Sequence, residues 1–535
     1  MAEVILIRPG FSKGLKFSDY TRESRPPAGL LYLAAPLVEH GFEVAIIDQS
    51  VEKDWKMRLQ KEIDHTTLCI GITCLTGYMI INGIEIAKLI RQYSNCPIIW
   101  GGVHPSLEVD STIASEYVDI IAQGEGEETL LELASALRNK ETLENIRGII
   151  YKKRGKVYKN GTRQPYDLNN LPSLPFHLIN LNYYKGHYSL SRYFRFESSI
   201  AVSIETSRGC THRCTYCVMA GNTYRERSKW RGMPAARIAG IVEEIIDTYG
   251  IKAFAFIDDN FFVNIDRVKE FLDELERRRL KIEWFADVRM DTIIKKMNID
   301  FLKRLERSGL RTLGIGIESG SDKILKYLCK GETRETYIEA NRILAATNIV
   351  PRYGILQGLP TETKEDAEQS YMLVATLLKD NPRCVPKLNK LLPTPGTPIF
   401  EECIKHGFTP PQKFADWADY CDTAWVHGPT TWMDKAAAEF IMSQLYYNDL
   451  LLFAMAKPKR GFVADVALKM ATKLLIYRIE KQFYSFKFER LFHRLIRASS
   501  VYPILKRLYT IYLRFNRKVA AQPHEGNSAM KIREA

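Results

Sequence analysis

Short hydrophobic runs alternate with amphipathic stretches through the first 150 residues. Each run is typical of a strand buried in a parallel sheet, and each stretch between two runs is long enough for a crossover helix. The expected strands cover residues 4–7, 44–47, 68–72, 98–100 and 120–121, and the clearest expected helices cover residues 30–40 and 79–93. The pattern predicts a doubly wound α/β domain over residues 1–150, whose ligand would lie beyond the carboxyl ends of the strands.

A second alternating pattern follows a segment of different composition. Lysines, asparagines, prolines and tyrosines cluster between residues 151 and 195, which we interpret as a linker. Six further strands are expected at residues 200–204, 253–257, 282–286, 312–317, 352–356 and 387–392, with helices between them. Six such units predict a partial (β/α)6 barrel over residues 196–400, with its chemistry at the carboxyl ends of the strands.

The strand pattern ends after residue 400, and residues 401–535 are expected to be mostly helical. Within them, residues 456–535 carry two apolar stripes at helical spacing. The stripes contain Val463, Val466, Met470 and Leu474, and then Leu505, Leu508, Tyr512 and Phe515. We therefore expect a C-terminal extension of amphipathic helices.

The composition is that of a globular protein. Of the 535 residues, 46% are hydrophobic and 26% are charged, which excludes disordered, collagen-like and disulfide-scaffold proteins. Ten cysteines are too few for a disulfide framework over this length. The sequence shows no basic leader before an apolar stretch and no run of about 20 apolar residues, so we expect a cytoplasmic protein.

The net charge of +13 comes from the C-terminal extension. Residues 456–535 hold 18 of the 76 Lys and Arg residues and 5 of the 63 Asp and Glu residues, so residues 1–455 are neutral. Basic and aromatic residues on amphipathic helices suit the surface of an anionic membrane, which predicts peripheral contact with the inner face of the membrane. Packing of the stripes on the rest of the protein is an equally good interpretation. Nucleic acid is a less favoured partner, because no known nucleic acid-binding motif is present.

Three cysteines stand close together after the first expected barrel strand. Cys210, Cys214 and Cys217 form a C-x3-C-x2-C pattern. Three thiolates at this spacing can hold three irons of a cubane cluster and leave the fourth iron open to a substrate. A structural zinc site with His212 as a further ligand is the alternative, but zinc usually takes two separated pairs of ligands. The pattern favours an iron–sulfur centre that takes part in chemistry.

This loop resembles the signature of the radical S-adenosylmethionine enzymes, in which an aromatic residue, here Tyr216, precedes the last cysteine. The resemblance implies that Cys210, Cys214 and Cys217 bind a [4Fe-4S] cluster whose fourth iron is chelated by S-adenosylmethionine. Reductive cleavage of S-adenosylmethionine would then give a 5′-deoxyadenosyl radical. The resemblance also implies an external electron donor, such as flavodoxin or ferredoxin.

Further segments similar to motifs of this family lie at later strand ends, in the expected order. They correspond to family residues near the methionine amino group, the ribose hydroxyls and the adenine ring. Each also has a structural interpretation: helix caps for the aspartates, an ion pair for the glutamate and turns for the glycines. The order along the barrel favours cofactor binding. The candidates are Asp258, Asp259 and Asn260 for the amino group, Glu318 for the ribose, Gly354 and Gly358 for adenine, and Arg289 facing the same pocket.

The first domain resembles the cobalamin-binding domain that precedes the barrel in a large subgroup of this family. Glycines at strand ends let the backbone approach a large ligand closely, and small polar residues can bond a nucleotide tail. The candidates for cobalamin contact are Ser50, Thr73, Gly101, Gly102, His104, Gly124 and Glu125.

Cobalamin-binding domains often carry a D-x-H-x-x-G motif whose histidine ligates cobalt from below. Here Asp48 is followed by Gln49 and Ser50, so the motif is absent, as is usual in this subgroup. His104 is a candidate replacement, but because Pro105 follows it, contact with the nucleotide tail or packing is the preferred role.

A second cluster, as in the related methylthiotransferases, is the rival interpretation of Cys69, Cys74 and Cys96. We expect Cys69 and Cys96 to fall at opposite ends of the parallel sheet, which would rule out a shared cluster. Burial as small apolar side chains is therefore the preferred interpretation.

The resemblance implies a cobalamin-dependent radical S-adenosylmethionine enzyme, and we predict a methyltransferase that acts on an unactivated carbon. The basic extension suggests a lipid or another membrane-resident molecule among small-molecule substrates. A radical reaction with the same cofactors but a different outcome, such as cyclisation, oxidation or rearrangement, is the second hypothesis. A non-enzymatic, cluster-containing binding protein is the third.

Overall fold

The structure is a computed structural model that describes residues 1–11, 25–185, 195–221, 229–420, 431–444, 473 and 476–482. The chain forms two compact units, Met1–Ile476 and Tyr477–Ala535, and nearly all described residues belong to the first. The predicted amphipathic helices of residues 456–535 lie outside the described residues, apart from a short helical segment at residues 476–480.

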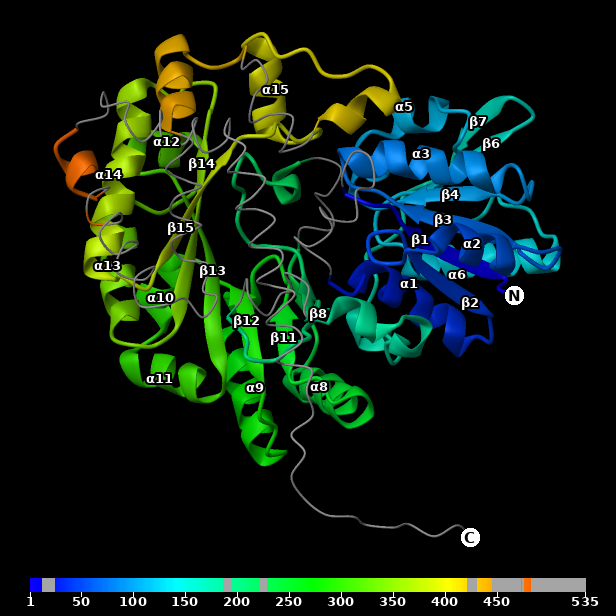
Figure 1. Cartoon of the computed structure of the whole chain (residues 1–535), viewed down its shortest axis with the longest axis horizontal. Helices are drawn as coiled ribbons and strands as arrows, with labels where there is room; N and C mark the ends of the chain where they lie inside the picture. The colour runs from blue at the N-terminus through cyan, green and yellow to red at the C-terminus, as the bar shows by residue number, and fades with distance from the viewer. Residues whose placement is uncertain are drawn as a thin grey trace, which may run out of the picture. The chain divides into compact units, whose positions relative to one another are not determined.

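The N-terminal domain is built on a seven-stranded sheet of order β2-β1-β3-β4-β5-β6-β7, blue to cyan in Figure 1. The first five strands of that order pair in parallel, as the hydrophobic pattern predicted. Its strands are β1 (Val4–Arg8), β2 (Val44–Asp48), β3 (Cys69–Thr73), β4 (Ile98–Gly101), β5 (Ile120–Ala122), β6 (Ile149–Lys153) and β7 (Lys156–Lys159). Its helices are α1 (Ala28–Glu39), α2 (Trp55–Glu62), α3 (Tyr78–Ile90), α4 (Val103–Leu107), α5 (Val109–Ala114) and α6 (Glu127–Asn139).

The first sheet has more strands than the sequence predicted. Residues from Tyr151 to Lys159, which we assigned to the linker, form most of an antiparallel hairpin of β6 and β7. The turn between the strands contains Gly155, which adopts a φ of +74° that favours glycine. Because β7 is fully exposed, it lacks the alternation of apolar and polar faces that would have revealed it.

The second sheet is an open, parallel, six-stranded sheet of order β15-β14-β13-β12-β11-β8, green to yellow in Figure 1, which confirms the predicted partial barrel. Its strands are β8 (Val202–Ile204), β11 (Ala253–Phe256), β12 (Glu283–Asp287), β13 (Leu310–Glu318), β14 (Val350–Gln357) and β15 (Val385–Lys390). The associated helices are α8 (Ala235–Tyr249), α9 (Ile265–Arg277), α10 (Met290–Lys296), α11 (Ile299–Arg307), α12 (Asp322–Tyr327), α13 (Arg334–Ala345) and α14 (Lys364–Asp380). The domain boundaries at residues 150, 195 and 400 stay predictions.

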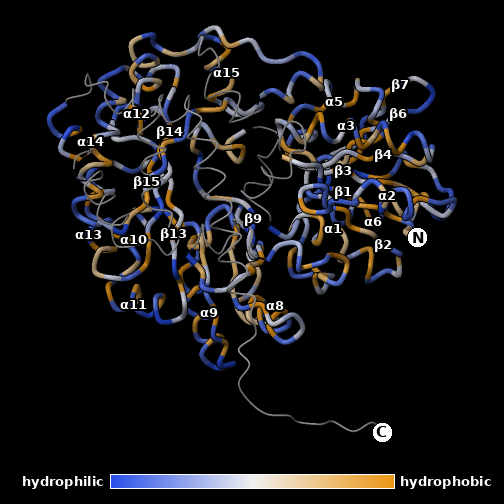
Figure 2. The backbone as a smooth tube through the Cα atoms, viewed as in Figure 1, coloured by the Kyte–Doolittle hydropathy of each residue, from blue (hydrophilic) through white to orange (hydrophobic). Residues whose placement is uncertain are grey.

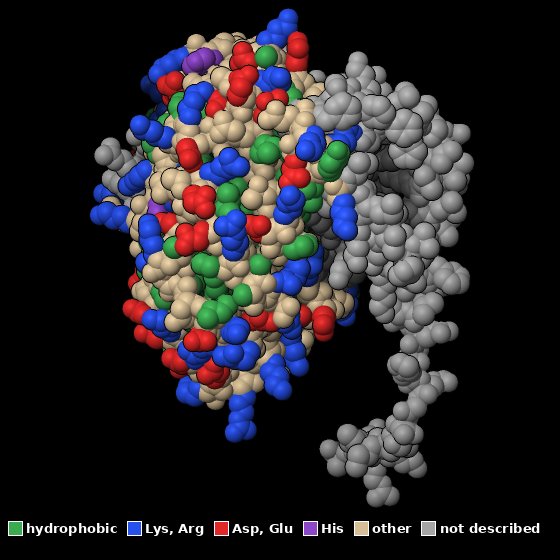
Figure 3. Space-filling model, turned by 90° about the vertical axis from the view of Figure 1, so that its left-hand side faces the viewer, with side chains coloured by type: hydrophobic (Ala, Val, Ile, Leu, Met, Phe, Trp, Pro, Cys, Tyr) green, Lys and Arg blue, Asp and Glu red, His purple; other side chains and the backbone are tan. Residues whose placement is uncertain are grey.

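Local signals explain where the barrel helices begin. Helices α13 and α14 start after Thr333 and Thr363, and each threonine forms a capping box with the third residue of its helix. The buried strands are largely hydrophobic and the outer loops largely hydrophilic (Figure 2). On the described face near α13 and α14, basic and acidic side chains are interspersed (Figure 3), which agrees with the neutral composition of residues 1–455.

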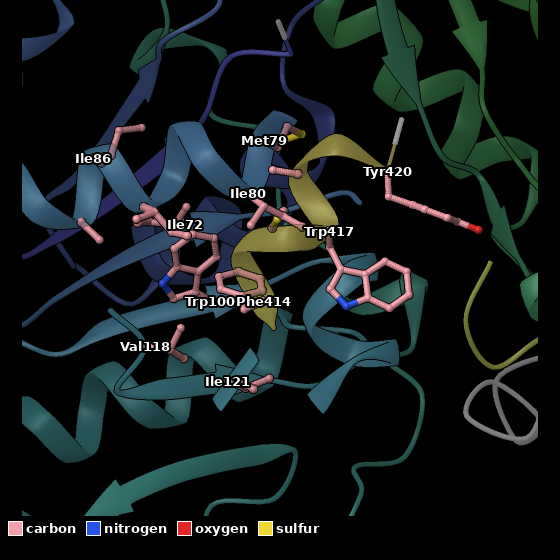
Figure 4. Close-up of a cluster of buried hydrophobic side chains, with 14 of the residues drawn as sticks. Ile72, Met79, Ile80, Ile86, Trp100, Val118, Ile121, Phe414, Trp417 and Tyr420 are labelled. Carbon is pink, nitrogen blue, oxygen red and sulfur yellow. The ribbon is translucent and has the colours of Figure 1, made fainter. Parts of the chain in front are cut away.

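A segment that follows the barrel packs on the first domain. After α15 (Pro398–Lys405), the short helix η8 (Phe414–Asp419) lies against α3. The ring of Phe414 meets the ring of Trp100 edge to face, with centroids 5.0 Å apart, inside one buried hydrophobic cluster (Figure 4). This contact between distant parts of the sequence fixes the C-terminal end of the barrel domain to the first sheet.

Candidate cluster and cofactor site

The three cysteines lie in the segment between β9 (Ser207–Arg208) and β10 (Arg231–Gly232), two short strands that pair antiparallel. Cys214 is buried, while Cys210 and Cys217 are half-buried. Burial raises the pKa of Cys217 to about 11, and the neighbouring thiols of Cys210 and Cys214 add to the shift. A bound metal reverses this effect, because a coordinated thiol loses its proton.

The three cysteine thiols are electrostatic neighbours of one another. Within the described ranges, three His, Cys, Asp or Glu side chains nowhere converge as they would around one metal ion. Besides burial, the Cys214 thiol raises the pKa of Cys210, and the thiols of Cys210 and Cys214 raise the pKa of Cys217. Neighbouring thiolates are the ligands that hold the irons of a [4Fe-4S] cluster.

Glu318, at the carboxyl end of β13, is tied directly to the cysteine loop. Its Oε1 accepts a hydrogen bond from the hydroxyl of Tyr216 at 2.7 Å and one from Nζ of Lys330 at 3.4 Å. Glu318 adopts a left-handed φ of +56°, where the register between β13 and β14 shifts. A strained backbone at a polar strand end is typical of functional sites.

Arg289 lies beside the cluster loop. Its Nη1 is 4.0 Å from the sulfur of Cys214, and its Nη2 donates to the carbonyl of Lys330 at 2.6 Å. The guanidinium also pairs with Asp291, at 3.2 Å, and Glu332, at 3.5 Å. Lys330, which is 5% exposed and follows α12, was not a sequence-based candidate, because no pattern marks a single buried lysine in a loop.

The structure assigns different tasks to the three residues after β11. The carboxylate of Asp258 is buried and accepts hydrogen bonds from Thr206 and Ser207, which hold the entry to the cysteine loop. Asn260 accepts from the N–H of Phe262, so this asparagine caps the short helix that follows, a role we had considered for the aspartates. Asp259 is exposed and accepts from the N–H of Gly209 at 2.8 Å, next to Cys210, so it is the best placed of the three for an added ligand.

Two glycines of β13 make room for carboxylates. A Cβ on Gly314 would lie 2.0 Å from Oδ1 of Asp287, and a Cβ on Gly316 would lie 2.0 Å from Oε1 of Glu318. Burial raises the pKa of Asp287 to about 7, with Asp258 adding to the rise and Arg352 opposing it. Sequence analysis missed Asp287, although the G-x-G spacing in β13 was a usable signal of close approach.

The two glycines expected near adenine occupy different backbone states. Gly354 lies within β14, and a Cβ there would meet nothing closer than 3.9 Å. Gly358 has a φ of +85°, its N–H donates to Glu362 at 2.5 Å, and its carbonyl accepts from the indole of Trp432 at 2.8 Å. Only at Gly358 does the turn itself require glycine.

Several candidates for cobalamin contact gather at the carboxyl ends of β2, β3 and β4. Ser50 is buried, and its hydroxyl has no partner in the part of the chain that the structure describes. Thr73 ends β3, and Gly101 ends β4. Gly102 has a φ of +97°, and a Cβ there would lie 2.8 Å from the carbonyl of Cys74. An unpaired buried hydroxyl beside closely approaching backbone fits a large polar ligand.

His104 is fully buried. Its Nδ1 lies 2.9 Å from the hydroxyl of Thr76, and its ring contacts Phe414 and Trp417 of η8, with centroids 5.6 and 5.5 Å away. Its Nε2 has no partner among the described residues, and burial lowers its pKa to about 4. The imidazole is therefore neutral at pH 7 and packs beneath η8.

The loop after β5 faces the barrel domain. Gly124 has a φ of +89°, and its N–H donates to the hydroxyl of Ser106. The carboxylate of Glu125 pairs with Arg208 at 3.0 Å and with Arg231 at 2.5 Å. Neither arginine was a sequence-based candidate.

Asp48 holds the place where the missing D-x-H-x-x-G motif would begin. Its carboxylate forms a buried, bidentate ion pair with Arg8 and accepts a hydrogen bond from the hydroxyl of Tyr184 at 2.8 Å. These partners give the aspartate a structural task that needs no following histidine.

The expected separation of two cysteines in the first sheet was wrong. Cys69 begins β3, and Cys96 lies two residues before β4. Because β3 and β4 are parallel neighbours, both cysteines lie at the amino end of the sheet. Cys74 lies beyond the opposite, carboxyl end. Burial raises the pKa of all three thiols, which supports their interpretation as apolar side chains.

Comparisons with known proteins agree with both halves of this site. The family described as the Radical SAM superfamily matches residues 204–374, and the B12 binding domain matches residues 22–134. An uncharacterized methyltransferase of Pyrococcus horikoshii is 27% identical over 409 residues, which cover 75% of this chain and 83% of that protein.

Two further similarities extend the comparison. An anaerobic magnesium-protoporphyrin IX monomethyl ester cyclase of Synechocystis sp. is 27% identical over 342 residues, 62% of this chain and 64% of the cyclase. The structure of the cobalamin-dependent S-adenosylmethionine radical enzyme OxsB with aqua-cobalamin bound has the same fold, with a TM-score of 0.66, 18% identity and coverage of 94% of this chain and 76% of that chain.

The chain belongs to the cobalamin-dependent radical S-adenosylmethionine enzymes. Its cofactors are a [4Fe-4S] cluster, S-adenosylmethionine and cobalamin. Enzymes of this family need an electron donor and a substrate. In the part of the chain that the structure describes, no helix has the length and apolar character needed to cross a membrane.

Proposed function

We propose that this enzyme methylates an unactivated carbon of a small or lipid-like substrate. The observation that carries the proposal is the tether between the two domains at the cluster loop: Arg208, two residues before Cys210, pairs with carboxylates of the first domain. Transfer of a methyl group to a substrate radical needs both domains to act on one substrate position, and positioning of this kind is a large part of catalysis.

The proposal assigns the cofactors to named residues. Cys210, Cys214 and Cys217 would hold the cluster, Asp259 and Glu318 would bind the amino and ribose groups of S-adenosylmethionine, and Gly358 would lie near adenine. Ser50, Thr73 and the backbone at Gly101 and Gly102 would receive cobalamin. When bound, the cluster and S-adenosylmethionine supply the radical, and cobalamin supplies the methyl group.

The protein's own contribution is to hold and orient. Tyr216 and Lys330 fix the direction of the Glu318 carboxylate, and Arg289 places positive charge beside the sulfur of Cys214. Positive charge near the cysteine sulfur stabilises negative charge on a bound cluster. The buried side chains between η8 and the first domain exclude water from the surface that η8 covers.

A reaction without methyl transfer is the second candidate. The cyclase similarity favours it, since that relative closes a ring by its printed name. The mass of the product separates the two outcomes, because methylation adds one carbon from S-adenosylmethionine and ring closure adds none.

The substrate class is inferred from charge. The +13 excess in residues 456–535, on a neutral body, favours a substrate that resides in or near an anionic membrane. Flotation with vesicles of phosphatidylglycerol and phosphatidylcholine tests this with the full chain and with residues 1–455. The full chain should float with the vesicles and the shortened chain should not. Equal flotation of the two proteins would contradict membrane contact through residues 456–535.

The reaction itself is tested with extracts of a strain that lacks the gene. Reconstituted, reduced enzyme with cobalamin and S-adenosylmethionine deuterated on its methyl group should label one extractable compound. A product heavier by a deuterated methyl group supports methyl transfer. A product without added label, formed together with 5′-deoxyadenosine, would contradict it and support the second candidate.

A further inference from the structure

Both ends of the cysteine loop are held by one carboxylate of the other domain. Strands β9 and β10, which flank the loop, place Arg208 and Arg231 opposite each other as register partners. Oε2 of Glu125 lies 3.0 Å from Nη1 of Arg208, and Oε1 lies 2.5 Å from Nη2 of Arg231. Glu125 therefore bridges the two strands from which the loop starts and to which it returns.

The bridge is set in a largely buried environment. The side chain of Glu125 is 14% exposed and that of Arg208 is 13% exposed. A third contact fixes the carboxylate further, because Oε2 also accepts from the backbone N–H of Tyr166 at 2.8 Å. Leaving a charged group this poorly solvated without a partner costs folding free energy. Loss of one of these partners should therefore disturb the others.

Arg208 has further partners on both sides of the domain boundary. Its Nη2 donates to Glu127 of α6 at 2.6 Å, and its Nε donates to Glu205 of its own domain at 2.7 Å. The hydroxyl of Tyr32, in α1, donates to the carbonyl of Glu205 and accepts from its N–H, both at 2.9 Å. Residues 205–208 are thus held to the first domain through both backbone and side chains.

Without Glu125, the two arginines would face each other across the β9–β10 pair. Arg208 would keep Glu127 and Glu205, but Arg231 would lose the ion-pair partner described for it. Like charges on paired strands repel, and a partly buried guanidinium without a partner is destabilised. The expected consequence is a shift of the cysteine loop relative to the first domain, with the fold of each domain retained.

We propose that Glu125 is a positioning residue that fixes the cluster loop relative to the cobalamin-binding domain. It sits in the loop after β5, at the carboxyl edge of the first sheet, where a ligand of such sheets binds. Its carboxylate therefore joins the edge that receives cobalamin to the loop that carries the cluster. This proposal rests on the proposed function, since fixed geometry between the two matters only if both cofactors act together.

The test compares Glu125→Gln with Glu128→Gln. Glu128, in the same segment, is 47% exposed and pairs with Arg163, which Glu132 also contacts, so its replacement removes the same charge with little structural effect. Glu125→Asp serves as the conservative variant that retains the charge. Iron and sulfide content and the unfolding curve establish that each variant is folded and loaded.

Two products measured without substrate separate positioning from cluster binding. Cleavage of S-adenosylmethionine to 5′-deoxyadenosine needs the barrel and its cluster, whereas S-adenosylhomocysteine formed with reduced cobalamin needs both domains. Glu125→Gln should lower the S-adenosylhomocysteine rate by about 10-fold and leave the 5′-deoxyadenosine rate within about 2-fold. Glu125→Asp should recover part of the loss, and Glu128→Gln should match the wild type. An unchanged S-adenosylhomocysteine rate, or an equal loss of both products, would overturn the proposal.

Hydrogen exchange of the enzyme without cobalamin tests the tether independently of catalysis. Backbone amides of residues 205–210 should exchange faster in Glu125→Gln than in the wild type or Glu128→Gln. Equal exchange in the three proteins would overturn the tether. If the wild type forms no S-adenosylhomocysteine, the proposed function fails, and faster exchange in Glu125→Gln alone would still support the tether.

Discussion

The hydroxyl of Tyr216 donates a hydrogen bond of 2.7 Å to the carboxylate of Glu318, which joins the cysteine loop to the end of β13. One residue precedes the last cysteine and the other ends the central strand of the barrel. The bond couples the orientation of a predicted ribose ligand to the loop that holds the cluster.

Tyr216→Phe removes this bond and leaves the ring in place. A hydrogen bond to a charged group contributes about 1.5–3 kcal/mol, and Lys330 still contacts Glu318, so we expect the KM for S-adenosylmethionine to rise about 10-fold. The measurement is 5′-deoxyadenosine formation at varied S-adenosylmethionine in the reduced enzyme. Tyr158→Phe, an exposed tyrosine of β7, is the control. An unchanged KM would mean that Glu318 does not contact the ribose.

Gly314→Ala should destabilise the barrel. The added Cβ would lie 2.0 Å from the carboxylate of Asp287 and 2.8 Å from the ring of Phe285, and such overpacking costs about 1–3 kcal/mol. Gly240→Ala in α8 is the matched control, since its Cβ meets nothing closer than 3.8 Å and alanine favours a helix. Urea unfolding should show a lower midpoint for Gly314→Ala alone. Equal midpoints would mean that Asp287 does not occupy this position.

Glu362 makes stability depend on pH. Burial raises its pKa from 4.5 to about 7, so the protonated side chain is favoured in the folded state. Its contribution to stability is full below pH 4.5 and is lost as the pH rises through about 7. Between pH 5 and pH 8, the wild type should therefore lose about 2.5 kcal/mol more unfolding free energy than Glu362→Gln. Glu365→Gln, an exposed change in α14, should behave as the wild type, and equal losses in all three proteins would contradict this assignment.

Trp417→Ala should weaken the attachment of η8 to the first domain. Trp417 is 1% exposed, and its ring contacts those of His104 and Tyr420. Truncation of a buried tryptophan costs about 3–5 kcal/mol. Tyr93→Ala, at a position 44% exposed, should change the unfolding free energy by less than about 0.5 kcal/mol. A similar loss in both variants would show that η8 does not pack as described.

Both sheets and the cysteine loop could be predicted because each rests on a local pattern. Apolar runs revealed β1, β3 and β4, and the spacing of Cys210, Cys214 and Cys217 identified the cluster loop. The hairpin of β6 and β7 was not predicted, because its outer strand is exposed on both faces.

Contacts across long sequence separations could not be predicted. Arg208 and Arg231 pair with Glu125 across the domain boundary. The ring of Phe414, in a segment distant in sequence, contacts the ring of His104. No periodicity marks such partners, because they follow from how two domains pack. Asp258 was expected to face S-adenosylmethionine, yet its carboxylate accepts hydrogen bonds from the hydroxyls of Thr206 and Ser207. The motif alone does not distinguish this structural role from cofactor binding.

The most direct test of the account is product analysis of the reduced, reconstituted holoenzyme with S-adenosylmethionine and cobalamin. The wild type should form 5′-deoxyadenosine and S-adenosylhomocysteine. Cys214→Ala should bind less iron and form no 5′-deoxyadenosine, whereas Cys384→Ala, at a buried cysteine next to β15, should match the wild type. Retention of 5′-deoxyadenosine formation by Cys214→Ala, or the absence of S-adenosylhomocysteine from the wild type, would contradict the account.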